Sequence, residues 1–369
     1  MLAKGPFRAD TVGSMLRTKV LKDAREKHEK KQLSAAELTA IEDKEIATLV
    51  KRLEGIGLTA VTDGEFRRSW WHFDFLEHIT GVEGYLGDSG IKFHGVETRP
   101  KKVRVVGKIG FSDKHPHIEH FKRLAKTVSA GHAAKMTIPS PSMLHYRGGR
   151  AAVPTSVYPD MQAYFHDLGM AYNGAIKAFY AAGCRYLQLD DTSLSYFCDP
   201  NERKMLKERG DDPDQLIKQY SATLGLALKD RPKDMTITTH TCRGNFKSTF
   251  VASGGYDPVA DMVFNQIDVD GYFMEWDDER SGGFEPLRKL PKGKKKVVLG
   301  LVTTKVGTIE KPDDIKRRID AAAKYAPLEQ LCLSPQCGFA STEEGNNIAE
   351  DDQWRKLEMI VAVARDVWK

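Results

Sequence analysis

Three short segments of the chain carry side chains suited to binding a metal ion, and each follows an apolar, strand-like run. The segments are Thr239-His240-Thr241-Cys242, Met274-Glu275-Trp276-Asp277 and Ser334-Pro335-Gln336-Cys337-Gly338. Together they offer one imidazole, two thiols and one carboxylate, a donor set that suits tetrahedral Zn²⁺. His240 and Cys242 are two residues apart on one strand, so their side chains share a face. If the strands are neighbours, the sequence predicts a zinc site at His240, Cys242, Glu275 and Cys337.

The charge of this donor set indicates which chemistry a bound zinc ion would support. Two thiolates and one carboxylate leave excess negative charge around Zn²⁺, which makes a weak Lewis acid for the activation of water. A substrate thiol is better suited, because a free thiol with a pKa of about 8.5 is mostly protonated at neutral pH, whereas a coordinated thiol is deprotonated. The excess negative charge keeps such a thiolate nucleophilic. The expected reaction is therefore the transfer of an alkyl group to sulfur.

Further polar residues end other strand-like runs and are candidates for binding the substrate. Glu65, in a Gly-Glu pair, and Asp190, in a Gln-Leu-Asp-Asp run, are expected to bind a substrate ammonium group. The alternative for these acids is a structural ion pair with a neighbouring arginine. Gly13 and Ser14 are candidates to bind a carboxylate through backbone N–H groups and a hydroxyl.

These residues must be positioned by alternating strands and helices. We expect strands at residues 9–14, 59–65, 135–141, 185–191, 235–242, 270–276, 297–304 and 330–337. We expect helices at residues 34–54, 160–182, 212–229, 256–266, 312–325 and 352–367. Such alternation indicates parallel pairing. Eight units predict an α/β fold of the (β/α)8 TIM-barrel type, with the active site at the carboxyl ends of the strands.

Two local features refine this expectation. Ser34 and Glu37 form a capping-box pattern at the start of the first predicted helix. Residues 80–112 look like a β-hairpin insertion after the second strand, so we expect one domain over residues 1–369. An open doubly wound sheet is the alternative, but it usually carries a glycine-rich first turn, and Gly13-Ser14-Met15 lacks that fingerprint.

Composition argues against several classes of protein. The net charge of +5 arises from 56 basic and 51 acidic residues, which is weak evidence for a nucleic-acid partner. No apolar run approaches the roughly 18–20 residues that span a bilayer, and the first ten residues lack the apolar stretch of a signal peptide. Five cysteines, an odd number, argue against a disulfide framework. We expect a soluble, cytoplasmic protein without a membrane or nucleic-acid partner.

With these residues identified, the chain resembles the catalytic domain of cobalamin-independent methionine synthases, and most closely the short, single-domain bacterial form. The motifs that carry the resemblance are His240-Thr241-Cys242 and Ser334-Pro335-Gln336-Cys337-Gly338-Phe339. The resemblance implies zinc bound by His240, Cys242, Glu275 and Cys337, and homocysteine as the acceptor of a methyl group. It also implies that Gly13, Ser14, Glu65 and Asp190 bind homocysteine.

The methyl donor is less well specified, because two motifs of the family are missing. The family's Ile-His-Ser-Pro motif after the seventh strand is replaced here by Val302-Thr303-Thr304-Lys305, and the tryptophan after the third strand is replaced by Met143-Leu144-His145-Tyr146. The donor candidates are therefore 5-methyltetrahydrofolate, a methylated corrinoid protein, a simpler methylated compound or an epoxide. His145 and Lys305 are candidate proton donors. Epoxyalkane:coenzyme M transferase, which alkylates a different thiol, is the alternative family, and a homo-oligomer is an open possibility.

Overall fold

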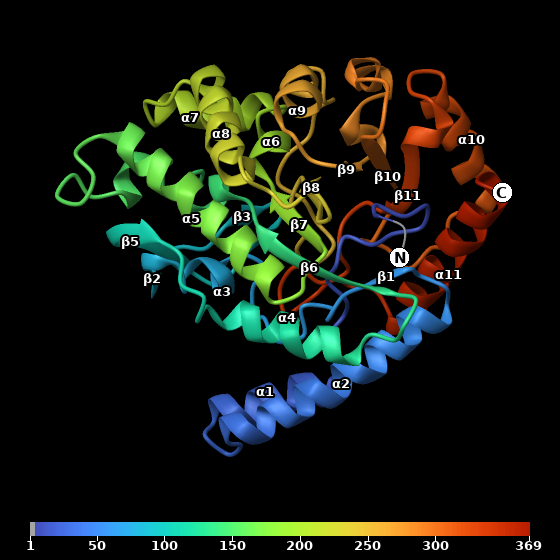
Figure 1. The fold of residues 1–369 in the computed structure, drawn as a ribbon, viewed down its shortest axis with the longest axis horizontal. Helices are drawn as coiled ribbons and strands as arrows, with labels where there is room; N and C mark the ends of the chain where they lie inside the picture. The colour runs from blue at the N-terminus through green and yellow to red at the C-terminus, as the bar shows by residue number, and fades with distance from the viewer. Residues whose placement is uncertain (1–3) are drawn as a thin grey trace.

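Seven parallel strands form the central sheet of the structure, a computed structural model that describes residues 4–369. In sheet order the strands are β1 (Ala60–Val61), β6 (Ala133–Pro139), β7 (Tyr186–Asp191), β8 (Thr236–Thr241), β9 (Gly271–Glu275), β10 (Lys296–Val302) and β11 (Leu331–Pro335). Figure 1 shows these strands in the interior of the molecule with the main helices outside them. The fold is therefore an α/β fold with a curled parallel sheet.

Helices connect the strands and cover the sheet, because a parallel pair requires a crossover connection. The helices are α1 (Lys19–Glu29), α2 (Ala35–Gly55), α3 (Phe73–Leu76), α4 (Pro116–Thr127), α5 (Met161–Ala181), α6 (Ser193–Tyr196), α7 (Pro200–Glu208), α8 (Pro213–Leu228), α9 (Ala260–Gln266), α10 (Pro312–Ala323) and α11 (Glu350–Val367). Every residue of β7, β8 and β9 is buried. Burial on both faces suits the mostly apolar β9, whereas β8 is built largely of threonine, a β-branched residue that favours strands.

The six predicted helices are present, with ends shifted by up to four residues. The capping box is also present, since the Ser34 hydroxyl accepts the Glu37 N–H at 3.2 Å and the Glu37 carboxylate accepts the Ser34 N–H at 2.8 Å. The sequence analysis did not predict α1, α4 and α7, nor the four-residue helices α3 and α6. In residues 4–369, no helix combines the length and apolar composition that a bilayer crossing requires.

The first predicted strand, residues 9–14, is wrong in its extent. Ala9 alone makes a parallel bridge, to Leu333 of β11. Immediately after it, the Asp10 carboxylate accepts the backbone N–H groups of Phe7 at 3.2 Å and Thr11 at 2.8 Å. Such local side-chain bonds compete with a strand ladder. Gly13 then adopts a φ of +146°, outside the strand region, so the segment does not continue as a regular strand.

Two antiparallel strand pairs lie between β1 and β6, where the sequence predicted a hairpin. β2 (Thr80–Leu86) pairs with β5 (Lys101–Gly110), and between them β3 (Lys92–Phe93) pairs with β4 (Val96–Glu97). The inner pair is connected to the loop after β8, because the His94 N–H donates to the Phe250 carbonyl at 3.1 Å. We refer to residues 80–110 as the insertion. Its inner pair thus reaches over the carboxyl ends of the strands.

A buried ion pair fixes the amino-terminal segment in the interior. Lys135 of β6 is fully buried, and its ammonium lies 3.1 Å from the Asp10 carboxylate, which also accepts the Tyr186 hydroxyl at 2.7 Å. The Lys135 ammonium also lies 4.0 Å from the centre of the Phe273 ring. Because a buried charge without a partner is costly, this pair makes the position of residues 8–13 dependent on Asp10.

Asp10→Asn is therefore expected to destabilise the protein by about 3–5 kcal/mol, because it leaves the Lys135 ammonium buried without a counter-charge. The matched control is Asp23→Asn, which removes the exposed ion pair between Lys19 and Asp23 on α1 and should change stability little. Urea denaturation followed by circular dichroism measures both free energies of unfolding. Equal effects of the two substitutions would contradict this account of the buried pair.

Candidate metal centre and adjoining pocket

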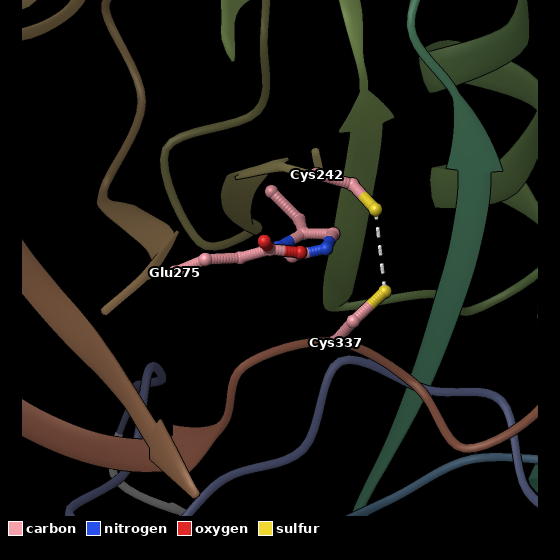
Figure 2. Close-up of side chains that lie close together, drawn as sticks. Cys242, Glu275 and Cys337 are labelled. Atoms are coloured by element: carbon pink, nitrogen blue, oxygen red, sulfur yellow. Dashed lines mark hydrogen bonds between the residues drawn. The ribbon is translucent and has the colours of Figure 1, made fainter. Parts of the chain in front are cut away.

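Four side chains predicted from the sequence as metal ligands lie together in the structure. One potential ligand atom from each of His240, Cys242, Glu275 and Cys337 lies within 4.8 Å of the others, and all four residues are buried. The sulfur atoms of Cys242 and Cys337 are 3.4 Å apart. Figure 2 shows Glu275 and the two thiol groups converging from separate parts of the chain. This spacing is compatible with one ion bound by all four residues.

The register of the parallel strands produces this convergence. His240 of β8 lies beside Phe273 of β9, and Glu275 at the end of β9 lies beside Gly300 of β10. Gly300 in turn lies beside Ser334 of β11, three residues before Cys337. Because the carboxyl ends of parallel strands meet at one end of the sheet, residues up to 97 positions apart in sequence become neighbours.

The hydrogen bonds around the cluster leave the ligand atoms of His240 and Glu275 free. The Nδ1–H of His240 donates to the Phe273 carbonyl at 3.2 Å, which leaves Nε2 available and without a hydrogen-bond partner among the described residues. Both carboxylate oxygens of the fully buried Glu275 likewise lack such a partner in residues 4–369. Buried polar atoms are rarely left unsatisfied in folded proteins. A bound cation would satisfy these atoms, so the residues fit a zinc ion.

The protonation of this cluster also suits metal binding. A hydrogen bond from Cys242 and the nearby His240 hold the pKa of Cys337 well below its usual range, although burial acts in the opposite direction. Burial lowers the pKa of His240, but its interaction with the nearby Cys337 outweighs burial and raises that pKa to about 9. Burial raises the pKa of Glu275. A metal ion would replace the protons that these groups hold, so its affinity should depend on pH.

A pocket adjoins the cluster and contains about 790 Å³ of empty space, open solvent at its mouth included. His240, Cys242 and Cys337 line it, together with Ser14, Glu65 and Asp190. Its other walls include the aromatic residues Trp70, Trp71, His72, Phe93, Tyr196 and Phe246. The insertion contributes Ile91, Phe93 and Thr98. The pocket is thus polar beside the cluster and mainly apolar and aromatic elsewhere.

Glu65 and Asp190 both lie in this pocket, as the sequence predicted. Glu65 is buried, and one of its oxygens accepts the Thr137 hydroxyl at 2.8 Å and lies 3.3 Å from an Arg68 nitrogen. Its other oxygen has no hydrogen-bond partner among the described residues. Asp190 accepts a hydrogen bond from the Gln188 amide at 2.7 Å. The ion pair with arginine and the free oxygen therefore coexist on Glu65.

The electrostatics of these two acids favour a cationic ligand. Burial raises the pKa of Asp190 to about 7, and the charge of Glu65 contributes to the increase. Burial also raises the pKa of Glu65, against the charges of Arg68 and Arg17. The Glu65 backbone has a φ of +59°, which is uncommon for a residue with a side chain and typical of strained functional sites. An ammonium group placed between the acids would stabilise both carboxylates.

The two remaining predicted residues differ in their position. Ser14 is buried, lines the pocket and packs so closely on Gly338 that a Cβ at position 338 would lie 1.9 Å from the Ser14 hydroxyl. Gly13 is not among the lining residues, and its carbonyl accepts the Thr62 hydroxyl at 2.6 Å. Gly13 therefore shapes the turn that presents Ser14.

Some residues turned out differently from the sequence-based expectations. His145 and Lys305, the candidate proton donors, do not line the pocket, and His145 is hydrogen-bonded at 2.7 Å to the Tyr220 hydroxyl in the core. The sequence analysis did not identify Arg280, which lies 3.5 Å from the Glu275 carboxylate. Nor did it identify His72, a buried residue of the pocket wall. The neighbouring Trp70 and Trp71 line the same wall.

Comparison with known proteins identifies the family. The family described as "Cobalamin-independent synthase, Catalytic domain" matches residues 7–365, which is almost the whole chain. The chain belongs to this cobalamin-independent synthase family. A Bacillus subtilis protein named "Uncharacterized protein YxjH" is 50% identical over 367 residues, covering 99% of this chain and 96% of the relative.

Two solved structures resemble this member of the cobalamin-independent synthase family. A Listeria monocytogenes protein, described as a candidate vitamin-B12 independent methionine synthase, shares 44% identity and a TM-score of 0.80, covering 100% of this chain and 99% of the other. A B12-independent methionine synthase from Shewanella, solved with selenomethionine, shares 19% identity and a TM-score of 0.73, covering 98% and 97% of the two chains, which supports the fold. Family membership indicates a methyltransferase of the methionine-synthase type.

Cys242→Ser and Cys337→Ser are each expected to reduce bound zinc from about one ion per chain to nearly none, because a hydroxyl replaces a thiolate ligand. The matched control is Cys332→Ser in β11, since this cysteine is equally buried but lies outside the cluster. Inductively coupled plasma mass spectrometry of purified protein measures the metal content. Full zinc occupancy in the two cluster variants would exclude these residues as ligands.

Proposed function

We propose that the protein is a zinc-dependent S-methyltransferase that transfers a methyl group to the thiol of homocysteine and forms methionine. The observation that carries this proposal is the buried convergence of His240, Cys242, Glu275 and Cys337 within 4.8 Å. These four residues would hold the ion. When bound, zinc supplies one chemical function, the stabilisation of the substrate sulfur as a thiolate at neutral pH.

The ligand atoms of the four clustered residues would favour nucleophilic attack by a substrate sulfur. Two thiolates and one carboxylate give the site excess negative charge, so the substrate sulfur keeps enough electron density to act as a nucleophile. The hydrogen bond from His240 Nδ1–H to the Phe273 carbonyl orients the imidazole and fixes its tautomer. Gly244 N–H donates to the Cys242 sulfur at 3.3 Å and stabilises negative charge there.

Glu65 and Asp190 would bind the ammonium group of homocysteine in this proposal. The cross-strand pairing of Asp190 with His240 supports this role, because it places the carboxylate next to a proposed metal ligand. The hydroxyl of Ser14, presented by the turn at Gly13, would bind the carboxylate end of the amino acid. The same acids disfavour coenzyme M, whose sulfonate would be repelled by them.

The remaining walls of the pocket suit a donor with a flat ring. Trp70, Trp71 and Phe93 provide aromatic surface in the same pocket as the ligand sulfur atoms. This surface supports 5-methyltetrahydrofolate as the first donor to test. The bond between the donor nitrogen and the methyl carbon would break as the carbon–sulfur bond of methionine forms, and the donor nitrogen would acquire a proton.

Product analysis tests the proposal directly. Zinc-loaded protein with homocysteine is expected to form methionine, detected by mass spectrometry, with 5-methyltetrahydrofolate as donor. Parallel reactions with methylcobalamin, with simple methylated compounds and with coenzyme M as the acceptor identify the alternatives. Removal of zinc with a chelator should abolish turnover and addition of zinc should restore it. Turnover that survives the removal of metal would overturn the mechanism.

The affinity for homocysteine is expected to fall as the pH is lowered through about 7. The pKa of Asp190 is raised to about 7 in the free protein, so below that pH the side chain is neutral and loses its attraction for an ammonium group. Asp190→Asn should bind homocysteine more weakly at pH 8 and lose this part of the pH dependence. Isothermal titration calorimetry from pH 6 to 8 measures both effects, and identical profiles in the variant and the wild type would exclude Asp190 as the contact.

A further inference from the structure

Lys305 carries a buried positive charge that has no role in the proposed function. The residue is only 7% exposed, and its ammonium nitrogen has no hydrogen-bond partner in residues 4–369. The acids whose pKa its charge lowers, Glu275 and Asp277, form their ion pairs with Arg280. Burial of an ammonium group without a partner is costly. Its position therefore indicates that it interacts with negative charge nearby.

The path of the chain places Lys305 beside the candidate metal centre. Lys305 follows the end of β10, which lies between β9 and β11 in the sheet. On one side, the Trp276 N–H, next to Glu275, donates to the Gly300 carbonyl of β10 at 2.9 Å. On the other side, the Thr304 N–H donates at 2.6 Å to the side chain of Gln336, which precedes Cys337. Lys305 thus follows the strand that lies between β9, which ends at Glu275, and β11, which precedes Cys337.

The other cation near Glu275 is already neutralised. Arg280 lies 3.5 Å from the Glu275 carboxylate, but it also pairs with Asp277 at 2.8 Å and with Asp278. Burial raises the pKa of Glu275, and the charge of Lys305 is the largest influence in the opposite direction. Burial raises the pKa of Asp277, but the charges of Lys305 and Arg280 outweigh it and lower that pKa. The charge of Lys305 therefore acts on Asp277 and on the cluster together.

The charge at the site changes when substrate binds. Two thiolates and one carboxylate around Zn²⁺ already leave an excess of one negative charge, and a substrate thiolate adds another. For the thiol to bind in this form its S–H bond must break, the proton must pass to solvent, and the sulfur must keep the electron pair. A fixed cation beside the cluster would favour this step.

We propose that Lys305 is a positioning residue whose ammonium group stabilises the negative charge added when the substrate thiol loses its proton at the site. This inference rests on the proposed function. It assigns Lys305 to the acceptor thiol instead of to the donor. Because Lys305 does not line the pocket, it makes no direct contact with either substrate. Lys305 acts through charge at a distance and is not a metal ligand.

The test compares the affinity of the zinc-loaded protein for homocysteine with that for norvaline, in which a methyl group replaces the thiol. Isothermal titration calorimetry at pH 7.5 gives the Kd for norvaline divided by the Kd for homocysteine, which measures the preference for the thiol. In Lys305→Met this ratio is expected to fall at least about tenfold from the wild-type value, because only the thiol ligand acquires charge. The affinity for norvaline should remain unchanged. Lys305→Arg, which keeps the charge, is the matched control and should retain the preference for homocysteine.

Two further measurements separate this role from a structural one. The Tm of metal-free Lys305→Met should be no lower than that of the wild type, since the substitution removes an unpaired buried charge. Lys305→Gln should show the same loss of thiol preference, which protects the test if the methionine variant folds poorly. A Tm lowered in both variants with an unchanged Kd ratio would make Lys305 structural and overturn the inference.

The outcomes also distinguish this inference from the proposed function. Wild-type protein that shows no preference for homocysteine over norvaline would overturn the proposed function, and the role of Lys305 with it. A strong wild-type preference that persists in zinc-replete Lys305→Met would overturn the role of Lys305 alone and leave the proposed function in place.

Discussion

Parallel strand register is the constraint on which the candidate site depends. Asp190, His240 and Glu275 end three successive strands of one sheet, and the register places each beside its neighbour strand at the same end. A shift of one residue in any strand would turn its side chains to the opposite face. The site therefore depends on the apolar residues that fix the register of β7 to β11, all of which are buried at their centres.

Charge compensation is the second requirement, because so many ionisable groups are buried near one another. Glu65 is offset by Arg68, Asp10 by Lys135, and Glu275 by Arg280. The remaining negative charge of the cluster would be offset by a bound metal ion and by Lys305. Buried ionic groups of this kind are costly to hold. Lys135 lies toward the amino ends of the strands, whereas Glu65 and Glu275 lie at the carboxyl ends, where such groups mark a functional region.

Loops, and not the sheet, form most of the pocket above the cluster. The insertion supplies part of the wall, and it is connected to the region after β11 by ion pairs from Arg99 to Glu343 at 2.7 Å and to Glu344 at 3.0 Å. The scaffold and its ligand set can thus remain constant while the loops determine which donor is accepted. This division explains why particular residues of this chain can be assigned to the methyl acceptor, whereas the methyl donor depends on the loops.

The sequence by itself determined the element order and the identity of the clustered ligands. Periodicity located the main helices and seven of the strands, and the residue types His240, Cys242, Glu275 and Cys337 specified a zinc-like donor set, because these properties are local. Tertiary structure alone decided what depends on distant partners. Hydrogen bonds from the backbone N–H groups of Phe7 and Thr11 to Asp10, with its ion pair to Lys135, replaced an expected strand. The Arg68 pair engages only one oxygen of Glu65 and leaves the other free. The position of Lys305 between two strand ends likewise follows from packing, which spacing along the chain does not encode.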